Sequence, residues 1–162
     1  MPEQRRTVRP PALDPHSVPL RPGAYPPPFD AAIKGREKHP LGDALGLKNY
    51  GVNLVRLKPG ARSALRHWHT LQDEFVWIVE GELVLVTDAG EQSLAAGSCA
   101  GFPAGKEDGH YLVNRTQRDA LYLEVGDRTP NDLPKYPDDD FAAVYVEDGK
   151  RIFVRKNGAR FT

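Results

Sequence analysis

The chain has 162 residues, enough for one domain with a hydrophobic core, and its 22 Lys and Arg residues balance its 22 Asp and Glu residues. A net charge of zero offers no basic surface to nucleic acid, and no apolar run is long enough to span a membrane. The N-terminus lacks the apolar core of a signal peptide, so we expect a cytoplasmic protein without nucleic-acid or membrane partners. Cys99 is the only cysteine, which excludes an internal disulfide, and its Ala- and Gly-rich surroundings predict a small buried residue.

Residues 1–50 are predicted to form an extended arm rather than an independent domain. Ten of the 15 prolines lie in the first forty residues. Because proline lacks an N–H donor and fixes φ, this segment cannot form a helix or a central strand. Residues 35–51 are a turn-rich approach with at most a short helical turn. The arm carries large apolar side chains that indicate packing against the rest of the protein: Leu13, Val18, Leu20, Tyr25 and Phe29.

Residues 51–128 consist of short β-rich runs separated by turn signals such as KPG, EG, DAG and AAG. No stretch in this region has a convincing helical period, so the pattern predicts an all-β barrel or sandwich. Residues 129–162 are predicted to be a loop followed by a β-hairpin, because Asp148 and Gly149 stand between two apolar runs. We expect this C-terminal hairpin to extend a sheet or to cover the edge of one.

The segment HWHTLQDE, residues 67–74, contains two of the five histidines. On a strand, His67 and His69 point to the same side, about two residue rises apart, and Trp68 points away. If the next strand lies beside the first, Glu74 joins the two histidines on that side. An HxH pair by itself is more often structural than metal-binding, so the interpretation depends on a further ligand.

The strand that begins at Glu74 is apolar on both of its faces. Val76 and Ile78 share the face of Glu74 and point inward. The side chains on the outer face are Phe75, Trp77 and Val79. Something must cover this outer face, and the Pro-rich arm and a partner subunit are the two candidates.

A third histidine, His110, opens the apolar run HYLVN after a corner made by Pro103 and Gly105. The corner returns the chain toward the HWH segment, although a lone histidine at a strand start is also compatible with a surface position. Three imidazoles and one carboxylate suit one divalent metal ion such as Zn, Fe, Mn or Ni, and the carboxylate favours harder ions such as Fe(II) or Mn(II). Four protein ligands on an octahedral ion leave two positions for water or substrate.

These residues resemble the two motifs of the cupin superfamily. The first motif reads Gly60, six residues, His67-Trp68-His69, four residues, Glu74, six residues and Gly81. The second reads Gly97, five residues, Pro103-Ala104-Gly105, four residues, His110, three residues and Asn114. The first motif is one residue longer before its HxH pair than the usual pattern, and the second is two residues longer before its histidine.

The resemblance implies an all-β fold, a cupin-type jelly-roll β-barrel with a metal ion inside it near one mouth, and a homodimer. The ligands carried over are His67, His69, Glu74 and His110. The segment GFPAGKEDGHYLVNRTQRDALYLEVGDR is similar to a group of small single-domain bacterial cupins that often carry sugar-phosphate isomerase labels, mostly without demonstrated activity.

Three functions are compatible with these residues. The first is a metal-dependent isomerase or epimerase of a sugar or sugar phosphate, the second an Fe(II)-type dioxygenase or lyase, and the third a non-catalytic module that binds a small ligand. Candidate proton-transfer residues are Glu124 and Tyr122, which share a strand face, and Tyr111 beside His110. Candidate cations for a phosphate group are Lys106, Arg66 and Arg115, each also compatible with a solvated surface charge.

Overall fold

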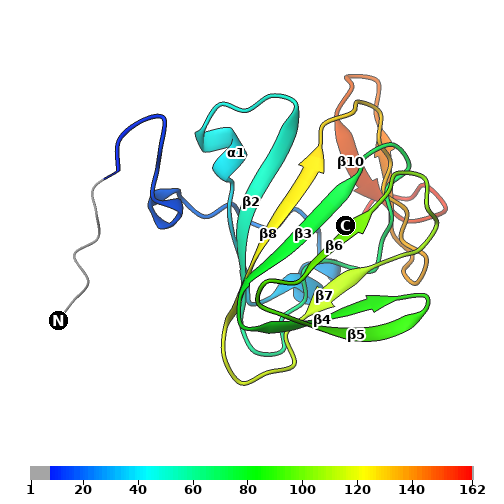
Figure 1. The fold of residues 1–162 in the computed structure, drawn as a ribbon. Helices are drawn as coiled ribbons and strands as arrows, with labels where there is room; N and C mark the ends of the chain where they lie inside the picture. Colours follow the sequence, from blue (N-terminus) through cyan, green and yellow to red (C-terminus); the bar gives the residue numbers. More distant parts are fainter. Residues whose placement is uncertain (1–7, 162) are drawn as a thin grey trace.

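The computed structural model describes residues 8–161, and ten β-strands dominate the regular structure of that range (Figure 1). The strands are β1 (Arg36–His39), β2 (Tyr50–Leu57), β3 (Glu74–Glu80), β4 (Glu82–Thr87), β5 (Gly90–Ala95), β6 (Cys99–Phe102), β7 (Tyr111–Val113), β8 (Ala120–Asp127), β9 (Ala142–Tyr145) and β10 (Arg151–Val154). The helices of this range are short: α1 (Leu41–Ala44) and two 3₁₀ turns, Pro15–Ser17 and Phe29–Ile33. None of these helices has the length and hydropathy needed to span a membrane.

Two antiparallel sheets enclose the main core. The larger sheet has the strand order β1-β2-β8-β3-β6, and the smaller has the order β5-β4-β7. Alternation along each strand sends every second side chain into the space between the sheets. The core residues include Val55, Leu57, Val76, Ile78, Leu83, Leu85, Leu94, Leu112 and Tyr122. The two sheets form a β-barrel of the jelly-roll type.

The strand β1 lies in the segment where the sequence predicts only turns. It pairs with β2 along its whole length, with Arg36 opposite Leu57 and His39 opposite Leu54. Its sequence, REKH, has no apolar residue, so it lacks the alternating pattern by which strands are recognised. The backbone pairing with β2 defines this strand, and the pairing turns Arg36 and Lys38 toward the barrel interior, where both line a cavity.

The Pro-rich arm packs against one half of the outer face of the larger sheet. Val18 of the arm and Leu41 of α1 are buried against Leu54 of β2 and Leu121 of β8. Leu20, by contrast, remains 51% exposed. The arm is therefore docked through part of its apolar surface, at the β2 and β8 side of the sheet.

The other half of that outer face is open. Phe75, Trp77 and Val79 of β3 are 39%, 45% and 46% exposed. Cys99, which pairs with Trp77 across β3 and β6, is exposed as well, so the prediction that it is buried is wrong. The cause is its place on an edge strand of the larger sheet, beside this uncovered surface.

The C-terminal hairpin is formed by β9 and β10, and Gly149 in its turn has a φ of 76°. It makes a two-stranded sheet of its own instead of extending either barrel sheet. The hairpin is held by an aromatic cluster around Phe141 that joins it to the arm, and the members packed there are Tyr25, Phe29, Leu65, Tyr136, Phe153 and Phe161. Figure 1 shows the hairpin on the far side of the barrel from α1.

Candidate metal centre

The segment that carries His67 and His69 is not a regular strand, and the prediction of one is wrong in this respect. It contacts its neighbours through isolated bridges, which pair His67 with His110 and Trp68 with Lys135. The extended backbone nevertheless keeps the two imidazoles on one side, with ring centroids 5.1 Å apart. Trp68 does not line the cavity that His67 and His69 share, although it lines a neighbouring pocket together with His69.

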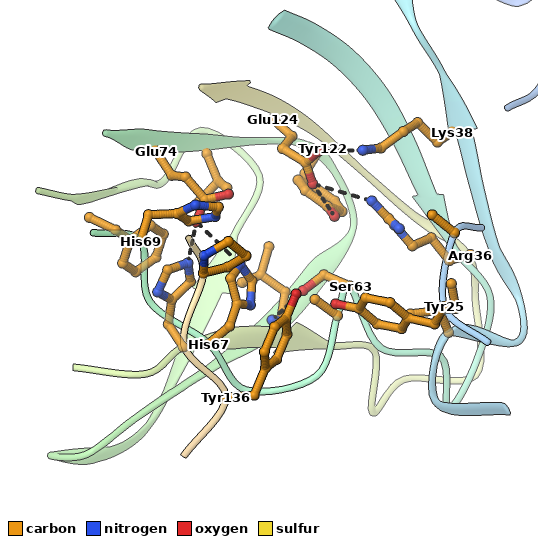
Figure 2. A pocket seen from close by; sticks show the side chains of 18 of the residues that line it. Tyr25, Arg36, Lys38, Ser63, His67, His69, Glu74, Tyr122, Glu124 and Tyr136 are labelled. Atoms are coloured by element: carbon orange, nitrogen blue, oxygen red, sulfur yellow. Dashed lines mark hydrogen bonds and ion pairs between the residues drawn. The ribbon is translucent and has the colours of Figure 1, made fainter. Parts of the chain in front are cut away.

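Three imidazoles converge on one carboxylate oxygen (Figure 2). The Nε2 atoms of His67, His69 and His110 lie 3.4, 3.5 and 2.8 Å from Oε2 of Glu74. Glu74 is the first residue of β3, as the alternation argument requires. His110 reaches this point despite the longer loop before it, because its backbone N–H donates to the carbonyl of His67 at 2.9 Å.

The other ring nitrogens fix how the histidines are turned. Nδ1 of His67 lies 2.8 Å from the carbonyl oxygen of Leu65, and Nδ1 of His69 lies 2.5 Å from Oδ2 of Asp132. The His110 ring stacks on Phe102 with centroids 3.5 Å apart, and its Nδ1 is buried without a hydrogen-bond partner among residues 8–161. Two of the three imidazoles are thus held as Nδ1 donors, which leaves Nε2 as the atom presented to the centre.

Asp132 is a supporting residue that the sequence analysis missed. Its side chain is 1% exposed, and it accepts hydrogen bonds from the Leu71 N–H at 2.8 Å and from the Thr70 hydroxyl at 3.2 Å, besides its contact with His69. It follows Asn131, whose φ of 65° is a turn conformation. The only sequence signal is the polar NDLP turn, which looks like an ordinary surface loop.

The ionisable side chains at the centre shift one another's pKa values. Burial alone would raise the pKa of the Glu74 carboxyl, but hydrogen bonds from the three imidazoles lower that pKa well below its usual value. Burial opposes a charge on His69, yet Glu74 and Asp132 together raise the pKa of His69 to about 9. Burial lowers the pKa of His110 despite the nearby carboxylate. Without a metal ion, His69 is therefore protonated at neutral pH.

The donor set fits a divalent metal ion. One nitrogen or oxygen atom from each of His67, His69 and Glu74 lies within 4.8 Å of the others, so these residues could hold an ion, and His110 adds its Nε2 beside Glu74. Nitrogen and carboxylate oxygen donors suit Zn, Fe, Mn and Ni alike, and the carboxylate favours the harder ions.

We expect metal affinity to rise with pH until His69 is neutral. Since a metal ion must displace the proton that His69 holds up to a pH of about 9, affinity should increase about tenfold per pH unit below that value. Calorimetry with chelator-buffered Ni²⁺ at several pH values, in buffers of different ionisation enthalpy, measures both the affinity and the released proton. A flat affinity between neutral pH and the pKa of His69 would contradict this expectation.

Replacing Asp132 by Asn should lower metal affinity about 10–100-fold, because the amide keeps the size of the side chain and loses the anionic partner of His69. The matched control is Asp138→Asn, which makes the same chemical change on an exposed carboxylate paired with Arg66. Competition with a chelator of known affinity gives the metal dissociation constant of each variant. Equal affinities in the Asp132 variant and the control would show that the His69 contact has no part in metal binding.

The histidines open into a cavity of about 210 Å³ inside the barrel. Glu124 and Tyr122 of β8 line it as well, and Figure 2 shows them between the histidines and two cations of β1. Glu124 accepts from Lys38 Nζ at 2.8 Å, and its Oε2 lies 3.3 Å from the Tyr122 hydroxyl and 3.6 Å from Arg36. This volume lies below the roughly 300–1,000 Å³ of drug-sized pockets, so the cavity suits a small ligand.

The cations keep Glu124 ionised. Burial would raise its pKa, but Lys38 and Arg36 lower it. Burial and the Glu124 carboxylate raise the pKa of Tyr122 well above its usual value, so the phenol stays protonated. The cavity therefore contains a buried carboxylate that can accept a proton and a phenol that can donate a hydrogen bond.

The predicted site residues divide into two groups. Glu124 and Tyr122 line the cavity together with the metal ligands, and Lys106 lines a second pocket that also borders on His69, Glu74 and His110. The structure does not bring the remaining three to the centre, and these are Tyr111 under Arg62, Arg66 paired with Asp88 and Asp138, and Arg115 paired with Glu91. Tyr111 is turned away because it neighbours His110 on an extended segment, and the two arginines are satisfied by surface carboxylates.

The cations that do line the cavity are Arg36, Lys38 and Arg151, none of which the sequence analysis selected. Two of them belong to β1, which the sequence did not indicate as a strand, and the third comes from the C-terminal hairpin. No local motif marks these residues, because the topology alone brings them together.

Comparisons with known proteins agree with this architecture. A family model described as a cupin domain matches residues 53–126. A solved structure from Silicibacter pomeroyi, described as a sugar phosphate isomerase from a cupin superfamily, is 49% identical, covers 93% of this chain and 96% of its own, and has a TM-score of 0.86. A structure from Acidithiobacillus ferrooxidans with a provisional sugar phosphate isomerase name is 28% identical, covers 78% and 80% of the two chains, and has a TM-score of 0.68.

The polyketide cyclase RemF from Streptomyces resistomycificus is 18% identical over 72% of this chain and 78% of its own, with a TM-score of 0.60, and shares the fold alone. No curated protein gives a significant match. The identity and coverage of the Silicibacter structure, together with the domain match, confirm the predicted jelly-roll fold and family, and the chain belongs to the cupin superfamily.

Proposed function

We propose that this cupin is a metal-dependent enzyme that isomerises or epimerises a small sugar or sugar phosphate. His67, His69, Glu74 and His110 would hold one divalent ion, Zn, Fe, Mn or Ni. The observation that carries the proposal is the position of Glu124, an ionised carboxylate that lines the same small cavity as these ligands. The name of the Silicibacter relative supports the same reaction class.

The reaction requires moving a proton at the carbon next to a carbonyl group. A bound divalent ion would polarise that carbonyl as a Lewis acid. Glu124 would accept the proton from one carbon and return it to another position, so that the protein ends unchanged. Tyr122, whose hydroxyl lies 3.3 Å from Glu124, would donate a hydrogen bond to the substrate oxygen or to the carboxylate. Phe102 and Tyr136 line the same cavity and help to exclude water.

Exchange with solvent deuterium tests this proposal. Sugars and sugar phosphates are incubated in D₂O with protein loaded with each metal in turn, and the proton signal beside the carbonyl is followed by NMR. We expect metal-dependent loss of that signal, and no loss in a His67→Ala variant. Absence of exchange with every metal and substrate would reject an isomerase, and oxygen uptake by the Fe(II) form would favour a dioxygenase instead.

We also propose that the open half of the outer sheet face is the contact between two copies of the chain. Three large apolar side chains of β3, Phe75, Trp77 and Val79, stay exposed there, and an uncovered patch of this kind is typical of an interface. The arm covers the outer face only at β2 and β8. The sequence suggests either the arm or a partner subunit as the cover of β3, and the partner subunit is therefore the remaining candidate.

Replacing Trp77 by Glu should weaken this dimer about 30-fold or more, because a central aromatic residue would be exchanged for a charge. Sedimentation analysis across a concentration series gives the dissociation constant. Leu45→Glu, at a residue 43% exposed beyond the end of α1, introduces the same charge away from the face and should leave the dimer intact. A wild-type protein that sediments as a monomer at high concentration would contradict the proposal.

A further inference from the structure

At the end of the cavity opposite the metal ligands, the positively charged side chains outnumber the one carboxylate, that of Glu124. Arg36 points inward from β1, and its Nε is buried without a hydrogen-bond partner among residues 8–161. A buried guanidinium nitrogen without a partner is costly, and it is the kind of donor that a ligand satisfies. The terminal nitrogen of this arginine lies 3.6 Å from Glu124, which is long for an ion pair, and the guanidinium also interacts with the Tyr122 hydroxyl.

Arg151 supplies a second guanidinium to the same cavity. It is the first residue of β10, its side chain is exposed, and within residues 8–161 it forms no ion pair. A neighbouring groove of about 500 Å³ shares Arg36, Lys38 and Arg151 with the cavity, and it also has Lys34 on its wall. The anionic side chain of that groove is Asp30. A passage with this charge attracts anions toward the cavity.

The ionisable side chains at this end of the cavity carry a net charge of about +2. Arg36, Lys38 and Arg151 carry three positive charges, and Glu124 carries one negative charge. Lys38 makes the shorter contact with Glu124, at 2.8 Å against 3.6 Å for Arg36, so the two guanidinium groups carry most of the uncompensated charge. Arginine presents planar pairs of N–H donors that match the oxygens of a phosphate group, and a phosphate monoester carries close to two negative charges at neutral pH.

We propose that Arg36 and Arg151 bind the phosphate group of a phosphorylated substrate at the end of the cavity opposite the metal ligands. The role of that substrate in a reaction rests on the proposed function, whereas the binding of the anion does not. Arg36, held on the sheet, would fix the position of the phosphate. Arg151, carried by the hairpin, would contact it from the open side and would need the hairpin in place.

Titration of the metal-free protein with inorganic phosphate tests the subsite without relying on catalysis. Calorimetry should give one phosphate per chain for the wild-type protein, with acetate at least tenfold weaker because it carries a single charge. Arg151→Ala should weaken phosphate binding at least tenfold, because charge-assisted hydrogen bonds are lost. The matched control is Lys150→Ala, which removes the same charge from the adjacent residue, whose partner is Asp148. Its affinity should stay within about twofold of wild type.

Arg36→Lys is the second variant, since it keeps the charge beside Glu124 and removes the Nε donor. It should weaken phosphate binding while its melting temperature stays near that of the wild type. Phosphate binding that is unchanged in Arg151→Ala, or absent from the wild-type protein at millimolar concentrations, would overturn the subsite. Acetate binding as tight as phosphate would overturn the assignment to a phosphate group. A protein that binds phosphate yet shows no metal-dependent exchange would refute the proposed isomerase and leave the subsite standing.

Discussion

Replacing Glu124 by Gln should lower the rate of metal-dependent proton exchange about 10²–10⁴-fold, the usual contribution of a positioned general base. The amide has nearly the shape of the carboxylate, but it cannot accept a proton at neutral pH. Glu124 does not belong to the metal ligands, so metal content should stay at the wild-type level. Deuterium exchange by NMR and elemental analysis of the same samples measure both quantities.

A lower exchange rate in the Glu124→Gln variant could also result from a less stable protein. This effect must be separated from the loss of the general base. Gln at this position leaves Lys38 and Arg36 without their carboxylate, and such cations are costly when buried. A thermal melt therefore accompanies the rate measurement, with Glu91→Gln as the matched control on an exposed carboxylate paired with Arg115. Exchange at the wild-type rate in a folded, metal-loaded Glu124→Gln protein would exclude this residue as the base.

Alternation along strands is what made part of the site predictable. It puts His67 and His69 on one side and makes Glu74, rather than Asp73, the carboxylate that meets them, and the structure has this arrangement. The same rule turns Tyr122 and Glu124 to one face of β8. These inferences hold because a period of two is a local property, readable from a few neighbouring residues.

The cationic wall could not be predicted in this way. Arg36 and Lys38 reach the cavity only because β1 pairs with β2, and a strand of four polar residues has no apolar alternation to mark it. Arg151 arrives from the hairpin, 115 positions after Arg36, through packing that sequence patterns do not encode. The contact of Asp132 with His69 likewise depends on a loop whose sequence resembles any polar turn.

Truncating Phe141 to Ala should lower the free energy of unfolding by about 3–5 kcal/mol, the usual cost for a buried aromatic residue in a core. Phe141 is 1% exposed and lies at the centre of the aromatic cluster. Its ring centroid is 4.8 Å from that of Phe29 in the arm and 4.7 Å from that of Phe153 in the hairpin. One substitution would therefore loosen two terminal segments at once. Since each kcal/mol shifts the midpoint of a domain of this size by about 2–4 °C, melting should fall by roughly 10 °C.

The same substitution should also weaken the metal centre, because the cluster is continuous with the segment that carries the first histidine. The Phe141 ring lies 4.8 Å from that of Tyr136, and the Tyr136 ring lies 5.9 Å from that of His67. Phe141→Leu retains most of the buried volume and should cost less, and Tyr50→Ala removes an aromatic ring that is 46% exposed, with little effect expected. A melting midpoint within 1–2 °C of wild type, roughly the shift for less than 1 kcal/mol, would mean that the cluster does not hold the arm and hairpin to the barrel. A lower midpoint with unchanged metal affinity would instead show that the ligands are positioned by the barrel sheets alone, independently of the terminal segments.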